Sequence, residues 1–286
     1  DYLRISPFCL IMKIGKFEIQ TVSGGKYKLD GGAMFGVIPK PLWEKTNPAD
    51  ERNRIELETN CLLIDSGDKK ILVDTGNGTK FSQKEKDIFG LENRSVLEES
   101  LKEKGVGPLD IDIVILSHLH FDHAGGATKS EGGEEVPAFP RASYIIQKGE
   151  WDDAMNNFGV MKYSYRKENL VPLKESGQVD FIEGDSEIVP GLHTVVTGAH
   201  TRHHQIIKID SKEDKGAYFA DLVPTTSHLK LPYLMAYDLL PHEVLLKKKE
   251  LLTQAAEEKW RIFFDHDPKV ATGKIFKEKE DVFAIE

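Results

Sequence analysis

The stretch Asp112-Ile-Val-Ile-Leu116-Ser117-His118-Leu119-His120-Phe121-Asp122-His123-Ala124-Gly125-Gly126 joins an apolar run to a dense group of metal-binding side chains. The run from 112 to 116 predicts a strand that is buried on both faces. His118 and His120 are two residues apart, so they project the same way from an extended segment. Asp122 and His123 follow where the chain turns. Three imidazoles and a carboxylate within six residues indicate a site for zinc or another first-row divalent metal.

Further candidate ligands follow later predicted strands. Zinc takes about four ligands per ion, and chain geometry keeps the four side chains above from filling one coordination sphere alone. Three more donors lie at strand ends, where a layered α/β sheet presents its site: His200, Asp221 and His266. Seven ligands suit two metal ions that share one bridging carboxylate.

The composition excludes several classes of partner. The chain has 286 residues with 38 basic and 47 acidic side chains, a formal charge of −9. This balance argues against nucleic acid or an anionic membrane as the main partner, because both attract net positive charge. No apolar run approaches the ~20 residues of a membrane span. Two cysteines, Cys9 and Cys61, are too few for a disulfide scaffold or a cysteine-based metal site.

One domain is expected, because the sequence contains no internal repeat, low-complexity tract or linker. Met12-Lys-Ile-Gly15 has the character of a native start, so residues 1–11 are interpreted as an N-terminal extension and residues 12–286 as the domain. The N-terminus lacks a basic leader and a small-residue cleavage site. The expected compartment is therefore the cytoplasm, with a processed secreted form as the alternative.

Strand and helix signals alternate along the chain. Two helices are predicted: one opened by a capping box at Ser95-Val-Leu-Glu98, and one opened by Pro241 with Leu245, Leu252 and Ala256 on its buried stripe. The basic run 247–249 is interpreted as the solvated face of the second helix. Gly24-Gly25 and Gly31-Gly32 are interpreted as turns. Strands are predicted at 17–22, 60–64, 70–73, 112–116, 143–147, 193–197, 205–209, 217–220 and 262–264.

The ordered ligand series resembles the metallo-β-lactamase-fold hydrolases, and Ile71-Leu-Val-Asp74-Thr-Gly76 resembles the first motif of that family. The resemblance spans residues 57–268 and is closest to the branch of N-acyl homoserine lactonases and methyl parathion hydrolase-like enzymes. It implies an α/β fold: a four-layer αβ/βα sandwich of two mixed β-sheets flanked by helices. A dinuclear site along one edge of the sandwich is part of the same expectation.

The resemblance also implies a role for each ligand. One metal ion would be held by His118, His120 and His200, and Asp221 would bridge to the other. The second ion would be held by Asp122, His123 and His266. Asp74 and His204 would orient ligands from behind, while His203 stands where relatives have a glycine. Both ions are expected to be Zn²⁺, with Fe, Mn or Co as alternatives.

The expected chemistry is hydrolysis by a hydroxide that bridges the two ions, with Asp122 as a proton shuttle and Asp221 as the bridging ligand. Substrate contacts are predicted from two long segments rich in aromatic residues, which indicate a small apolar or acylated substrate. Many lactonases of this branch carry a tyrosine three residues after the bridging aspartate, but this chain has Pro224 there. The candidate pocket walls are Met34, Phe35, Trp43, Phe121, Trp151, His228, Tyr233 and Tyr237, of which His228 or Tyr237 could replace that tyrosine.

Three functions follow from this interpretation. The leading one is a lactonase acting on quorum-signal lactones or related esters. The first alternative is an organophosphate triesterase or aryl esterase of the methyl parathion hydrolase type, and the second is an iron-dependent dioxygenase. Similar lactonases are commonly dimers, so a homodimer is expected by analogy.

Overall fold

The computed structural model of this chain describes residues 11–92, 94–160, 163–211 and 214–286. The N-terminal extension proposed for residues 1–11 therefore lies outside the described residues except for Ile11, as does Cys9. Cys61 is a buried free thiol.

Two seven-stranded sheets form the centre of the molecule. In hydrogen-bonded order, the first sheet consists of β1 (Met12–Ile14), β2 (Phe17–Asp30), β3 (Arg54–Asp65), β4 (Lys70–Val73), β5 (Ile113–Ile115), β8 (Ser143–Gln147) and β9 (Val179–Ile182). The second consists of β10 (Ser186–Val189), β11 (Leu192–Val196), β12 (Gln205–Asp210), β13 (Lys215–Tyr218), β14 (Arg261–Phe263), β15 (Thr272–Lys279) and β16 (Val282–Ile285). Each sheet mixes parallel and antiparallel pairs. A separate hairpin joins β6 (Thr128–Glu131) to β7 (Glu134–Pro137).

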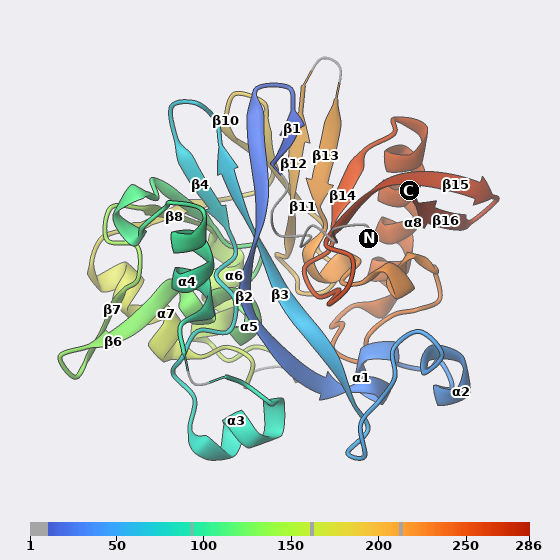
Figure 1. The fold of residues 1–286 in the computed structure, drawn as a ribbon, viewed down its shortest axis with the longest axis horizontal. Coiled ribbons are helices and arrows are strands. Elements are labelled where there is room, and N and C mark those ends of the chain that lie inside the picture. The colour runs from blue at the N-terminus through green and yellow to red at the C-terminus, as the bar shows by residue number, and fades with distance from the viewer. Residues whose placement is uncertain (1–10, 93, 161–162, 212–213) are drawn as a thin grey trace, which may run out of the picture.

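Helices cover the outer face of each sheet. Figure 1 shows the long β2–β3 hairpin in the middle of the molecule, with α4, α6 and α7 on one side of it and α8 on the other. The α-helices of the described residues are α1 (Gly31–Phe35), α2 (Lys40–Trp43), α3 (Gln83–Phe89), α4 (Val96–Glu103), α5 (Phe121–Ala124), α6 (Lys148–Met155), α7 (Lys167–Glu175) and α8 (Pro241–Glu257). Short 3₁₀ turns add η2 (Pro108–Asp110), η3 (Gly125–Ala127), η4 (Ala220–Leu222) and η5 (Thr226–Leu229).

Separate apolar clusters between these layers establish the sandwich. Strand residues such as Ile64 and Ile207 meet between the two sheets. Leu101 of α4 and Leu173 of α7 pack on the outer face of the first sheet. Leu252 of α8 packs on the outer face of the second sheet. The order helix, sheet, sheet, helix confirms the predicted four-layer αβ/βα architecture.

The predicted strands lie where the structure has strands, with different lengths. Strands 70–73 and 143–147 have the predicted bounds. The strand predicted at 17–22 continues to Asp30, because Gly24-Gly25 forms a bulge inside β2 instead of a turn. A Cβ at Gly24 would lie 2.7 Å from the Cα of Gly76, so glycine permits this close backbone approach. Gly31-Gly32 likewise begins α1 instead of forming a turn.

Two predictions about helices are wrong. Ser95 makes no side-chain capping hydrogen bond at the start of α4, whereas Ser82 and Glu85 form a complete capping box on α3. The basic run of α8 is not wholly solvated, because Lys248 is fully buried. Its Nζ donates to the carbonyl oxygens of Tyr233 at 2.7 Å and Lys230 at 3.2 Å. Buried carbonyl groups thus supply its partners, whereas Lys247 and Lys249 pair with the exposed carboxylates of Glu250 and Asp281.

In the part of the chain that the structure describes, no helix combines the length and the apolar character needed to cross a membrane.

Candidate metal centre

The predicted ligands meet at one edge of the sandwich because each follows a strand that ends there. His118 and His120 lie on the loop after β5, and α5 adds Asp122 and His123. From the second sheet come His200 after β11, Asp221 on η4 after β13, and His266 after β14. All seven side chains are buried. The site is therefore assembled from both sheets.

One group of four donors consists of His118, His120, His200 and Asp221, whose ligand atoms all lie within 4.8 Å of one another. His200 Nε2 is 3.2 Å from His120 Nδ1 and 3.0 Å from Asp221 Oδ2. His118 Nε2 is 3.5 Å from the same carboxylate oxygen. These are the three histidines and the carboxylate expected around one ion.

A second group consists of His123, Asp221, Asp265 and His266. Asp221 belongs to both groups, since its Oδ2 faces His200 while its Oδ1 is 3.1 Å from His266 Nε2. The two imidazoles of the second group approach each other, with their Nε2 atoms 3.2 Å apart. Asp221 is thus placed between the two groups, in the position expected of a bridging carboxylate.

Asp122 lies beside the second group, with Oδ2 3.6 Å from His266 Nε2 and Oδ1 4.0 Å from His123 Nε2. The hydroxyl of Tyr27 donates to Asp122 Oδ2 at 2.7 Å. The sequence pattern from His118 to His123 predicts that Asp122 belongs to the site. Tyr27 comes from the middle of β2, and no local pattern marks it as a site residue.

The residues present fit divalent ions. Ligands around one tetrahedral Zn²⁺ with bonds of 2.0–2.1 Å lie about 3.3 Å apart, which matches the donor spacings above. Within the described residues, His118 Nε2, His120 Nε2 and Asp221 Oδ1 are buried polar atoms without a hydrogen-bond partner. Buried polar atoms of this kind require a partner, and a divalent metal ion would supply one.

Outer contacts fix the orientation of the imidazoles. His123 Nδ1 is 2.8 Å from Asp74 Oδ2, and the hydroxyl of Tyr218 donates to the same oxygen at 3.0 Å. His200 Nδ1 is 2.9 Å from Asp238 Oδ1. These contacts direct the Nε2 atoms of both rings at the site, as outer hydrogen bonds do for metal-binding histidines. Asp74 is the predicted orienting residue, whereas Asp238 has no sequence signal of its own.

His204 packs against the ligand rings, 5.3 Å from His118 and 5.9 Å from His200 between ring centroids. Its Nδ1 is 2.8 Å from Thr197 Oγ1. His203 lies at the edge of the site instead, half-exposed, with Nε2 3.9 Å from Asp153. Nearby, Glu150 of α6 ties two ligand loops together, accepting from Leu119 N at 3.2 Å and Thr201 Oγ1 at 2.7 Å.

Burial sets the protonation of the first group. It lowers the pKa of His118 and His120 well below the usual range for imidazole, and neighbouring imidazoles add to the effect. Both rings are therefore neutral at pH 7, the form that binds a metal. Burial also opposes a charged His200, but Asp221 and Asp238 raise its pKa to about 10. A metal ion that binds His200 must displace this proton, so metal affinity should fall as the pH falls.

An apolar cavity of about 380 Å³ opens above the two groups. Its floor includes His120, Asp122, His200, Asp221 and His266. The walls are mainly apolar and aromatic, which suits a substrate with an acyl or aryl group. They are formed by Leu29, Met34, Phe81, Ile88, Phe89, Phe121, Tyr163, Met235 and Tyr237, together with Tyr27 and the polar side chains of Glu85, Ser164 and Arg166.

Three predicted wall residues, Met34, Phe121 and Tyr237, line this cavity, and five do not. Trp151 packs in the core between the first sheet and its helices. Phe35 stacks on both Trp43 and His228, at centroid distances of 5.3 and 5.0 Å, and Tyr233 packs edge-on against it. His228 is further held by Thr225 at 2.8 Å and by the carbonyl oxygen of Met34 at 2.9 Å. These side chains form a local core behind the cavity wall. The prediction that they line the cavity is therefore wrong, because they lie deeper than its wall.

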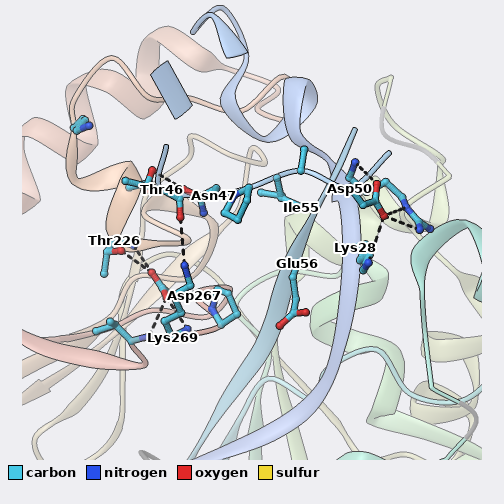
Figure 2. A pocket seen from close by; sticks show the side chains of 16 residues that line it. Lys28, Thr46, Asn47, Asp50, Ile55, Glu56, Thr226, Asp267 and Lys269 are labelled. Carbon is cyan, nitrogen blue, oxygen red and sulfur yellow. Dashed lines mark hydrogen bonds and ion pairs between the residues drawn. The ribbon is translucent and has the colours of Figure 1, made fainter. Parts of the chain in front are cut away.

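Figure 2 shows a second cavity, of about 590 Å³, lined by residues of β2, β3 and the loops at 46–50, 226–230 and 267–270. No member of the two donor groups lines it. Its charged side chains are largely paired: Asp50 accepts from Arg54 and Lys28, and Asp267 accepts from the backbone and side chain of Thr226. These contacts hold the loops of this cavity together. The two donor groups lie outside it.

Residues 54–266 match the family model of the metallo-β-lactamase superfamily. The chain belongs to this superfamily. An N-acyl homoserine lactonase of a Bacillus species is 30% identical over 238 residues, which cover 78% of this chain and 87% of the relative. An N-acyl homoserine lactonase of Bacillus thuringiensis is 30% identical over 228 residues, 74% of this chain and 82% of the relative.

Two solved structures share the fold over nearly the whole chain. One described as a probable metal-dependent hydrolase from Staphylococcus aureus is 33% identical, with a TM-score of 0.88, covering 96% of this chain and 99% of its own. The dizinc quorum-quenching lactonase AidC superimposes with a TM-score of 0.79 at 23% identity, covering 97% and 96% of the two chains. This protein is accordingly a hydrolase of the metallo-β-lactamase superfamily with histidine and aspartate groups suited to divalent metal.

Proposed function

We propose that the chain is a dinuclear metal-dependent lactonase that hydrolyses N-acyl homoserine lactones or closely related lactones. The observation that carries the proposal is an apolar cavity whose floor is formed by two donor groups sharing Asp221. The relatives named N-acyl homoserine lactonase support the same substrate class. An apolar cavity accepts an acyl chain, while the polar floor receives the lactone ring.

In this proposal His118, His120 and His200 would hold one ion, His123, His266 and Asp122 would hold the other, and Asp221 would contribute to both. Two divalent cations, Zn²⁺ being the simplest choice, would supply an acidified water and a Lewis acid for the lactone carbonyl. Asp122 lines the cavity and is the carboxylate placed to accept a proton and return it to the departing ring oxygen. Hydrolysis adds water across the ester bond, leaving a carboxylate and an alcohol.

Tyr237 is the proposed hydroxyl donor to the substrate carbonyl. Pro224 has no hydroxyl, and its carbonyl oxygen accepts from the backbone N of His266 at 2.9 Å. His228 lies outside the cavity and is already bonded on both ring nitrogens. Tyr237 lines the cavity, and burial raises the pKa of its phenol well above the usual range, so the hydroxyl keeps its proton.

We expect Tyr237→Phe to lower kcat/KM for a lactone by about tenfold, the loss of one hydrogen bond worth roughly 1.5 kcal/mol. Metal content should stay at the wild-type value, because Tyr237 belongs to neither donor group. Steady-state kinetics with metal analysis of the same samples measures both. Unchanged kcat/KM would assign the carbonyl contact to another group.

A panel of substrates tests the proposed function as a whole. The metal-loaded protein should hydrolyse an N-acyl homoserine lactone with a higher kcat/KM than an aryl ester or an aryl phosphotriester. Asp221→Ala removes the shared ligand and should lose both bound metal and turnover, by about a hundredfold or more. Full turnover by a metal-depleted Asp221→Ala protein contradicts the mechanism.

The aryl esterase or phosphotriesterase alternative has one observation in its favour. Phe81, Phe89 and Phe121 form a ring cluster in the cavity wall, with centroid distances of 5.2–6.4 Å. Such a wall also suits an aryl leaving group. Preferential turnover of the phosphotriester in the panel would select this alternative. Oxygen uptake with the iron-loaded protein tests the dioxygenase alternative in the same samples.

A further inference from the structure

A buried carboxylate outside the predicted ligand set lies against the second donor group. Asp265 follows β14, and its side chain is 1% exposed. Its Oδ2 is 3.2 Å from His266 Nε2 and 4.0 Å from His123 Nε2. Neither of its oxygens has a hydrogen-bond partner among the described residues. A carboxylate that is buried without a donor is stabilised either by protonation or by a positive charge nearby, and a metal ion at this group would supply that charge.

The backbone around Asp265 is held in place by β3. Asn60 Nδ2 donates to the carbonyl oxygens of Phe264 at 3.0 Å and Asp267 at 2.9 Å, on either side of Asp265. The backbone N of Asn60 donates to Asp265 O at 2.6 Å. Three hydrogen bonds therefore fix the loop, so the fold itself directs the Asp265 side chain at the donor group.

The other donors of the group face the same point. His266 Nδ1 is 2.9 Å from the carbonyl oxygen of Glu58, to which it donates, and this leaves Nε2 as the ligand atom. His123 has its Nδ1 on Asp74 and its Nε2 toward the group. The ligand atoms of His123, His266, Asp221 and Asp265 lie within 4.8 Å of one another. Two ionised carboxylates this close repel each other, and a cation between them would offset the repulsion.

We propose that Asp265 is a direct carboxylate ligand of the second metal ion, together with His123, His266 and Asp221. The inference rests on the metal-dependent function proposed above. Asp265 thereby adds a carboxylate to the ligands proposed above for this ion, among which Asp122 also accepts from Tyr27 through Oδ2.

The two ions then differ in their surroundings. The first group offers three imidazole nitrogens and one carboxylate, and the second offers two of each. Carboxylate oxygens suit Mn²⁺ better than imidazole nitrogens do, because Mn²⁺ is the harder ion. The second group is therefore the one that admits Mn²⁺ in place of Zn²⁺, and Asp265 is the residue that makes the difference.

Asp265→Asn tests the proposal because it keeps the size of the side chain and removes its charge. Metal content is measured after dialysis against buffered Zn²⁺, and the Kd of each ion by competition with a chromophoric chelator. Wild-type protein should bind two ions. Asp265→Asn should keep the first ion and bind the second at least about tenfold more weakly, since even outer partners of ligands change affinity by about 10–100-fold. Mn²⁺ uptake at the second group should fall in parallel.

Asp267→Asn is the matched control on the same loop. Asp267 is buried but accepts from Thr226, Lys269 and Val270, and it belongs to neither donor group. Figure 2 shows its contacts to the loops of the second cavity. This variant should keep both ions with wild-type Kd while losing thermal stability.

The outcomes distinguish the assignment of Asp265 as a ligand from the proposed function. Two ions of unchanged Kd in Asp265→Asn overturn the assignment of Asp265 and leave the proposed function standing. Wild-type protein that binds no metal overturns the proposed function itself. Asp265→Ser, smaller and also uncharged, takes the place of Asp265→Asn if the amide prevents folding.

Discussion

At the scale of the residue, Tyr27 connects the core to the proposed proton carrier. Its ring is buried, and its hydroxyl donates to Asp122 Oδ2 at 2.7 Å. Burial raises the pKa of Tyr27 well above its usual range, and the charge of Asp122 adds to the effect. The hydroxyl therefore stays protonated throughout the neutral range. It holds Asp122 in one orientation.

Tyr27→Phe should lower kcat by about tenfold or more while metal content stays the same, because Asp122 loses its fixed orientation. The free energy of unfolding of the metal-depleted protein should fall by about 1–3 kcal/mol, the loss of a hydrogen bond to a charged group. Kinetics, metal analysis and denaturant unfolding measure the three effects.

Tyr144→Phe is the control for this prediction. The hydroxyl of Tyr144 donates to Ala127 O at 3.0 Å and accepts from Phe139 N at 3.1 Å. Its loss should lower stability and leave turnover unchanged. Equal kcat in Tyr27→Phe and Tyr144→Phe would remove Tyr27 from the proposed mechanism.

At the scale of the element, α8 carries a buried cation under the cavity wall. Lys248 binds the carbonyl oxygens of Lys230 and Tyr233, in the segment that leads to Met235 and Tyr237. Burial lowers the pKa of Lys248 to about 7, against a small opposing effect of Asp238. The helix thus holds this segment by hydrogen bonds that persist whether or not the amine is charged.

The lowered pKa of Lys248 predicts how stability depends on pH. Between pH 7 and the unfolded value of 10.5, the unfolded chain binds the extra proton. Stability therefore rises with pH in this window, by up to about 1.4 kcal/mol per unit. Lys248→Met should flatten this slope and leave the mutant less stable than wild type at high pH, where two carbonyl groups lose their donor.

Denaturant unfolding at a series of pH values measures the difference between Lys248→Met and wild type. Lys247→Met provides the control, because Lys247 is half-exposed and pairs with Glu250 on the surface of the same helix. The free energy of unfolding of Lys247→Met should change with pH in parallel with that of wild type. A parallel curve for Lys248→Met would mean that the buried amine keeps an ordinary pKa.

At the scale of the whole molecule, the donor groups join the two sheets. His118, His120, Asp122 and His123 come from the first sheet, while His200, Asp221, Asp265 and His266 come from the second. The two groups each draw on both sheets. Bound metal therefore cross-links the halves of the sandwich, and the unfolded chain has no such preformed site.

Metal binding should accordingly stabilise the protein against unfolding. At a free Zn²⁺ concentration of about 100 times Kd, one ion adds about 2.7 kcal/mol. This corresponds to a rise in Tm of about 5–10 °C for a chain of this size. Calorimetry of chelated and Zn²⁺-loaded protein measures the shift, and Asp221→Ala should show little of it. An unchanged Tm in wild type would contradict tight binding at the two groups.

The sequence by itself determined the local part of this protein. His118, His120, Asp122 and His123 are recognisable because six consecutive residues suffice to bring their side chains together. Sheets covered by helices were also predictable, because the buried strand β5 carries a continuous apolar run, while the four-layer arrangement was implied by the family resemblance. Downstream ligands became recognisable through their order along the chain and their places after strands.

Only the tertiary structure decided the contacts that join distant segments. Tyr27, Asp238 and Asp265 have no local pattern, since each acquires its role from a partner on another element. The same holds for aromatic residues: Phe35 and Phe121 are alike in sequence character, yet one lies in a core and the other in the cavity wall. Composition and periodicity report that a side chain is apolar or ionisable. Which atoms surround it depends on how the two sheets pack, and that packing is fixed by contacts between residues far apart in the chain.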